Sequence, residues 1–85
     1  MQLHNRHNYP SMRIDGQKLR TLREGKFLTL DELADAAHVH RDSLGRIERG
    51  AWKGGSRIPT IRRIAEALDV PPSELIEDHR PSAPA

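Results

Sequence analysis

Apolar residues recur three and four positions apart along most of residues 13–76, which is the period of amphipathic helices. The β-branched residues follow the same spacing and do not alternate at every second position, so no strand is predicted. Two prolines in succession, Pro71-Pro72, separate the last apolar positions from the rest. The pattern predicts an all-α domain of five helices, whose apolar positions are Ile14, Leu19 and Leu22; Leu30, Leu33, Ala34 and Ala37; Leu44 and Ile47; Ile58, Ile61, Ile64, Ala65 and Leu68; and Leu75 and Ile76.

Polar residues and glycines at the expected places mark the ends of the first three helices. Asp15 lies in the first turn of the first helix, and Gly25 lies near its end. Thr29 followed by Glu32 has the spacing of a capping box, in which each side chain bonds the backbone N–H of the other residue. Gly50 predicts a left-handed residue after the third helix, His40–Arg49.

The fourth and fifth helices are delimited mainly by proline. Ser56 is the expected N-cap of the fourth helix, and Pro59 falls in its first turn, where a missing N–H has no consequence. Pro71-Pro72 end this helix, and Ser73 is the expected cap of a short fifth one. Between the third and fourth helices, Ala51–Gly55 reads as a loop.

The sequence divides into one folded body and two polar ends. Residues 1–12 show no periodicity and predict a flexible arm, residues 13–78 form the domain, and residues 79–85 predict a disordered tail. The chain has no cysteine, no apolar run of membrane-spanning length and no apolar segment typical of a secretory signal. These features fit a cytoplasmic protein.

Charge is distributed unevenly although the net charge is only +2. Residues 12–63 carry 12 Lys/Arg and 7 Asp/Glu, a difference of +5, whereas residues 64–85 carry one Arg and five acids, a difference of −4. A basic body is expected if one face meets a polyanion, and a solvated surface of mixed charge explains the same count.

The second and third helices are joined by a short link, His38-Val39, within Thr29–Gly50. Two short helices joined so closely cross at a steep angle, which is the helix-turn-helix arrangement. The outer face of the third helix is then polar, and in a helix-turn-helix this face enters the major groove of DNA. Its residues are Arg41, Asp42, Gly45, Arg46 and Arg49.

Three segments, Leu28–Ala34, His38–Gly50 and Ile61–Val70, resemble the Cro/phage-repressor-type (XRE) helix-turn-helix family. The runs Ile47-Glu-Arg-Gly50 and Ile64-Ala-Glu-Ala-Leu68 make the resemblance fairly specific, and it covers about residues 13–77. It implies a compact five-helix domain of the lambda-repressor-like type, and commonly a homodimer on a palindromic operator. His38, His40 and Leu30 depart from the family pattern, and the Ala51–Gly55 loop is longer than usual.

The resemblance also implies roles for individual residues. Three positions match those that read base edges, with Ser43 as a neighbouring candidate, and four match positions that often contact phosphates. Arg23 and Glu48 match a structural ion pair between the first and third helices, whose loss would cost on the order of 3–5 kcal/mol if it is partly buried. The base-reading positions are Arg41, Asp42 and Arg46, and the phosphate positions are Thr29, His40, Arg49 and Lys53.

Each of these roles has a simpler alternative. Arg46 can bind guanine bidentately or pair with Asp42 four residues earlier, and Asp42 can accept a hydrogen bond from cytosine or orient Arg46. Lys53 and Arg57 flank a glycine-rich loop, where they either clamp the DNA backbone or belong to a mobile loop. Trp52 is expected to pack on the core or over the third helix rather than to contact a partner.

Neither a metal site nor an active site is expected. The histidines at 4 and 7 and at 38 and 40 are too few per cluster for a metal, and no catalytic constellation or cofactor motif is present. The sequence therefore predicts a non-enzymatic transcriptional regulator of double-stranded DNA, a repressor acting by operator occupancy. Two alternatives stay open: the antitoxin of a toxin–antitoxin pair that represses its own operon, and a module of this fold that binds a protein partner.

Overall fold

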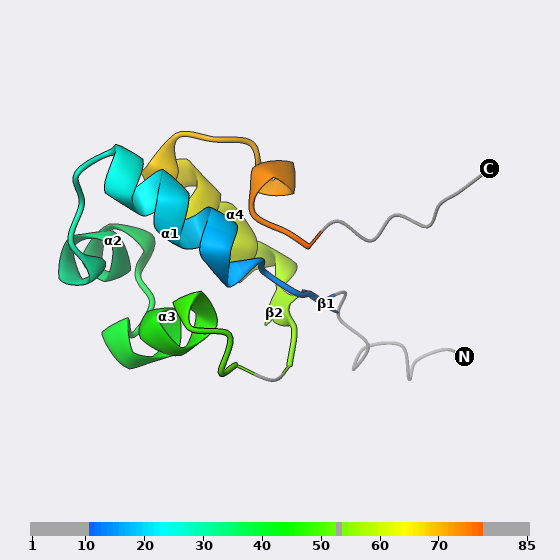
Figure 1. The fold of residues 1–85 in the computed structure, drawn as a ribbon. Helices are drawn as coiled ribbons and strands as arrows, with labels where there is room; N and C mark the ends of the chain where they lie inside the picture. Colours follow the sequence, from blue (N-terminus) through cyan, green and yellow to red (C-terminus); the bar gives the residue numbers. More distant parts are fainter. Residues whose placement is uncertain (1–10, 53, 78–85) are drawn as a thin grey trace, which may run out of the picture.

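A computed structural model describes residues 11–52 and 54–77 of the chain. The predicted tail at 79–85 lies outside the described residues, as does the predicted arm at 1–12 apart from Ser11 and Met12. The described part of the chain contains four α-helices, α1 (Gly16–Gly25), α2 (Leu30–Ala37), α3 (Arg41–Glu48) and α4 (Ile58–Leu68). Figure 1 shows α2 and α3 side by side, and α2 also packs against α4.

The prediction of a fifth helix is wrong. Between α4 and Glu77, where the described residues end, the only helical segment is the three-residue 3-10 helix η2 (Pro72–Glu74), in which the Glu74 and Leu75 N–H groups donate to the carbonyls of Pro71 and Pro72. Ile76 then forms an isolated antiparallel bridge with Ile14: the Leu75 carbonyl accepts from Asp15 N–H at 2.8 Å, and Glu77 N–H donates to the Arg13 carbonyl at 2.9 Å. This pairing with the segment before α1 prevents further helical turns.

The structure also contains two short strands that the sequence pattern did not predict. β1 (Ser11–Met12) pairs antiparallel with β2 (Ser56–Arg57), with Ser11 opposite Arg57 and Met12 opposite Ser56. Strands of two residues are too short to show an alternating pattern. Ser56 is therefore a buried strand residue, and the N-cap of α4 is Arg57, which corrects the predicted cap; Pro59 lies in the first turn as expected.

The ends of the first three helices follow the capping residues of the sequence. Asp15 is the N-cap of α1, one position before the predicted first turn, and its Oδ1 accepts from two backbone N–H groups. The capping box of α2 is confirmed: Thr29 Oγ1 accepts from Glu32 N–H at 3.0 Å, and Glu32 Oε1 accepts from Thr29 N–H at 2.8 Å. Gly50 has φ +77°, the left-handed conformation that was expected after α3.

One apolar core joins all four helices and the segment around η2. Burial of each large aliphatic side chain contributes about 1.5–3 kcal/mol, so the seven that are fully buried dominate the stability of this small domain. The partly buried Val39 and Trp52 pack against the same core from the α3 side. The fully buried side chains are Leu19, Leu33, Leu44, Ile61, Ile64, Leu68 and Leu75.

Candidate nucleic-acid interface

The helix α3 has a buried side and an exposed side. Leu44 and Ile47 face the core, as the spacing predicted. Arg41, Asp42 and Arg46 are exposed, and so is Arg49, the residue that follows the helix. Gly45 was expected on the outer face and is instead buried, because α2 approaches it: a Cβ at this position would lie 3.4 Å from Leu30 Cδ2.

An ion pair fastens α3 to α1. Arg23 Nε donates to Glu48 Oε2 at 2.7 Å and Arg23 Nη2 donates to Glu48 Oε1 at 3.0 Å, so the contact is bidentate. Arg23 Nη1 also donates to the Leu28 carbonyl at 2.8 Å. The side chains are 14% and 8% exposed. The hydrogen bonds from Arg23 to Glu48 raise the pKa of the arginine, and desolvation opposes this effect. The pair thereby holds the end of α3 against the turn that leads into α2.

A close backbone approach fixes the same end of α3. Gly16, the first residue of α1, lies against the backbone carbonyl groups of Ile47 and Glu48, so close that a Cβ would collide with both. Nothing in the sequence pattern marks this glycine, because the contact joins residues that are some 30 positions apart. Together with the Arg23–Glu48 pair, it gives α3 one orientation relative to α1.

Arg41 forms an ion pair that the sequence pattern did not predict. Its Nε lies 2.7 Å from Asp31 Oδ1, in the first turn of α2, and both side chains are largely exposed. The outer face of α3 and the start of α2 therefore form one surface. In contrast, no ion pair joins Arg46 to Asp42 within the part of the chain that the structure describes.

The candidate phosphate contacts lie around this surface rather than in one cluster. Thr29 is exposed at the N-terminus of α2, and His40 is the exposed N-cap of α3 without a side-chain capping bond. Arg49 follows α3, and Arg57 is exposed where β2 leads into α4. Lys53 lies outside the described residues.

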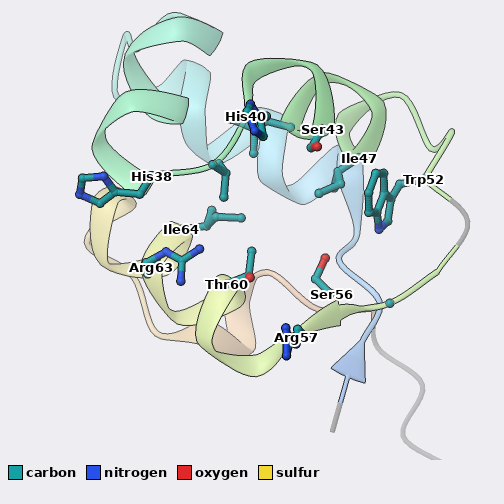
Figure 2. Close-up of a pocket in the computed structure, with 13 residues that line it drawn as sticks. His38, His40, Ser43, Ile47, Trp52, Ser56, Arg57, Thr60, Arg63 and Ile64 are labelled. Atoms are coloured by element: carbon teal, nitrogen blue, oxygen red, sulfur yellow. The ribbon is translucent and has the colours of Figure 1, made fainter. Parts of the chain in front are cut away.

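Ser43 and Trp52 do not share the exposed face of Arg46. Both are half-buried, and both line a groove between α3 and α4 that Figure 2 shows in close-up. Trp52 packs against the core cluster, which agrees with its expected packing role. Its indole Nε1 is buried and has no hydrogen-bond partner among the described residues.

Comparison with known proteins identifies the family. The family model described as "Helix-turn-helix domain" matches residues 16–77. The chain belongs to this helix-turn-helix family. It is 41% identical over 56 residues to the HTH-type transcriptional repressor RghR of Bacillus subtilis, covering 66% of this chain and 41% of RghR. The chain thus spans about two-fifths of the length of that curated relative.

Two solved structures show how this fold is used elsewhere. SinR, a master regulator for biofilm formation solved in complex with DNA, is 33% identical with a TM-score of 0.64, over 68% of this chain and 90% of that one. A hydroxyethylphosphonate dioxygenase contains a similar domain, 33% identical with a TM-score of 0.66, over 82% of this chain and only 15% of the enzyme. The helix-turn-helix fold therefore also occurs as a small part of a larger enzyme.

The described residues hold no group of three or more side chains suited to a metal ion. No helix within residues 11–52 and 54–77 is long and apolar enough to cross a membrane.

Proposed function

We propose that this chain is a sequence-specific, non-enzymatic DNA-binding repressor that acts by occupying an operator. The observation that carries the proposal is the exposed face of α3. Arg41, Asp42 and Arg46 point to solvent on a helix whose other side is fixed by the core, the Arg23–Glu48 pair and the close contact with Gly16. A rigid helix with exposed polar side chains is what reading of the major groove requires.

The exposed side chains are suited to distinct roles on DNA. Arg46 has no intramolecular ion pair among the described residues and can form a bidentate contact with guanine O6 and N7. Asp42 can accept a hydrogen bond from cytosine N4. Its negative charge disfavours binding to sequences that lack this donor. Arg41 contacts a base or a phosphate once its ion pair with Asp31 is broken. Ser43 is a weaker candidate, because it lines the groove behind this face.

The phosphate contacts fix the register of the domain on DNA. The capped N-terminus of α2 at Thr29 presents backbone N–H groups to a phosphate, and His40, Arg49, Lys53 and Arg57 supply the side chains. We propose that two copies bind a palindromic operator in the cytoplasm, with half-sites about one helical turn apart. No cofactor takes part in this mechanism.

Selection of bound sites from random double-stranded DNA, followed by titration with the selected site, tests the proposal. Arg46→Ala should weaken binding by about 1–3 kcal/mol, or roughly 5- to 150-fold, and relax the preference at one base position. Arg20→Ala removes an equally exposed arginine from α1 and serves as the control. The proposal fails if Arg46→Ala and Arg41→Ala bind the selected site as tightly as Arg20→Ala.

A further inference from the structure

The groove behind the exposed face of α3 is large enough for a small molecule. It has a volume of about 520 Å³, within the range of roughly 300–1,000 Å³ that is typical of ligand sites. Leu44 and Ile47 of α3, Ile64 of α4 and Val39 of the link before α3 supply apolar surface, and Trp52 closes one side (Figure 2).

The ionisable side chains that line this groove are all basic. Arg57 and Arg63 line it from the α4 side, His40 lines it at the N-cap of α3, and His38 lines it at the C-cap of α2. None of the lining residues is acidic. Arg63 is held in place because its Nε donates to the Ala37 carbonyl at 3.0 Å. An apolar floor with a cationic rim favours a ligand that carries a negative charge on an apolar body.

We propose that this groove binds a small organic anion, such as an aromatic or aliphatic carboxylate, sulfonate or phosphate ester. The apolar body would lie between Trp52 and Ile64, with the anionic group near Arg57 or Arg63.

Charge argues against occupation of the groove by the ends of the same chain. Residues 1–10 contain one arginine and two histidines but no acid, so they carry the same sign as the rim. The side-chain charges of residues 78–85, one Asp and one Arg, cancel. Charge complementarity therefore favours a separate anion.

A ligand at this position would oppose DNA binding, a consequence that rests on the proposed function. His40 and Arg57 line the groove and are also candidate phosphate contacts, so an anion bound in the groove would compete with the DNA backbone for these side chains. Because the coupling is reciprocal, DNA would weaken ligand binding by the same factor. The ligand would act as an inducer that binds the helix-turn-helix domain itself.

The single tryptophan of the chain allows a direct binding test without DNA. The probe is 1-anilinonaphthalene-8-sulfonate, an aromatic anion whose absorption overlaps tryptophan emission, and N-phenyl-1-naphthylamine is the matched neutral compound. We expect saturable quenching of Trp52 emission by the anion, with at least about threefold weaker binding of the neutral probe, the upper part of the range for one exposed charge contact. Equal affinity for the two probes, or no saturable quenching, overturns the proposal.

Variants on adjacent positions of α4 locate the probe. Arg63→Gln removes a rim charge, whereas Arg62→Gln removes an exposed charge that does not line the groove. Thr60→Phe fills the groove from the same helix. Arg63→Gln should weaken the anion about threefold and Thr60→Phe should abolish its binding, while Arg62→Gln should bind like the native protein. If both groove variants bind the anion unchanged, with native circular dichroism, the assigned site is wrong.

Fluorescence anisotropy of labelled operator DNA then tests the coupling. Saturating anion should raise the Kd for DNA at least threefold in the native protein and not in Thr60→Phe. If the anion binds and DNA affinity does not change, the inducer role is refuted while the ligand site stands. If the protein binds no DNA at all, the proposed function fails, and the quenching experiment still decides the groove.

Discussion

Replacement of Glu48 by alanine should destabilise the domain more than removal of any other single salt-bridge carboxylate among the described residues. The change deletes both short hydrogen bonds to Arg23 and leaves this arginine, whose side chain is only 14% exposed, without its counter-charge. Breaking one partner of a buried pair costs about 3–5 kcal/mol. Because Arg23 keeps its bond to the Leu28 carbonyl, we expect the lower end, about 3 kcal/mol.

This loss is large for a domain of this size, whose total stability is about 5–10 kcal/mol. At about 4–8 °C per kcal/mol, the midpoint of thermal unfolding should fall by about 12–24 °C. Urea unfolding followed by circular dichroism at low temperature gives the same difference as a free energy. The hydrogen bonds to Glu48 raise the pKa of Arg23 in the native protein, and an arginine without them still stays charged far above neutral pH, so the loss should not change between about pH 6 and pH 9.

The chain offers a matched control on α1. Glu24 accepts from Arg20 at 3.0 Å in an exposed pair four residues apart, which contributes about 0.5 kcal/mol or less. Glu24→Ala should therefore leave the midpoint nearly unchanged. A double-mutant cycle with Arg23→Ala and Glu48→Ala should show strong coupling. If Glu48→Ala costs less than about 1 kcal/mol, or if the two substitutions are additive, the proposed role of the pair as a clamp is refuted.

Further predictions concern the interface and the contacts that orient it. Asp31→Asn should strengthen DNA binding roughly 1.5- to 5-fold by releasing Arg41 and removing a negative charge, and unchanged or weaker binding in a DNA titration would contradict this. Gly16→Ala should cost about 1–3 kcal/mol of stability in urea unfolding, since its Cβ would collide with the carbonyl groups at the end of α3, whereas Gly25→Ala, with open space around it, should behave like the native protein. Thr29→Ala should cost about 1 kcal/mol through loss of the cap, and Thr29→Ser should restore it; equal stability of the two variants would argue against the cap. If Arg49, Lys53 and Arg57 of two copies neutralise about six phosphates, log K should fall with log salt concentration with a slope of about −5, and a slope near zero would exclude phosphate binding.

The sequence determined the four α-helices of the described residues and the polar face of the helix that we propose to enter the major groove. Periodic apolar residues place the buried side chains on one face of a helix. Thr29 and Glu32 bond the free backbone N–H groups at the start of their own helix. Both signals therefore depend only on residues that are close in the sequence. Leu44 and Ile47 were assigned to the core for the same reason, and Arg41, Asp42 and Arg46 to the exposed face. The Arg23–Glu48 contact was anticipated only through the family resemblance, because the two residues are 25 positions apart.

The tertiary structure decided everything that depends on contacts between distant segments. The fifth helix gave way to a 3-10 turn because the backbone around Leu75 pairs with residues 13–15, and the strand pair that displaced Ser56 from its capping role is equally non-local. The partner of Arg41, the need for glycine at position 16 and the cationic groove beside Trp52 arise from the packing of α3 against α1, α2 and α4. Local spacing fixes which side of a helix is apolar, whereas only the fold fixes which groups meet there.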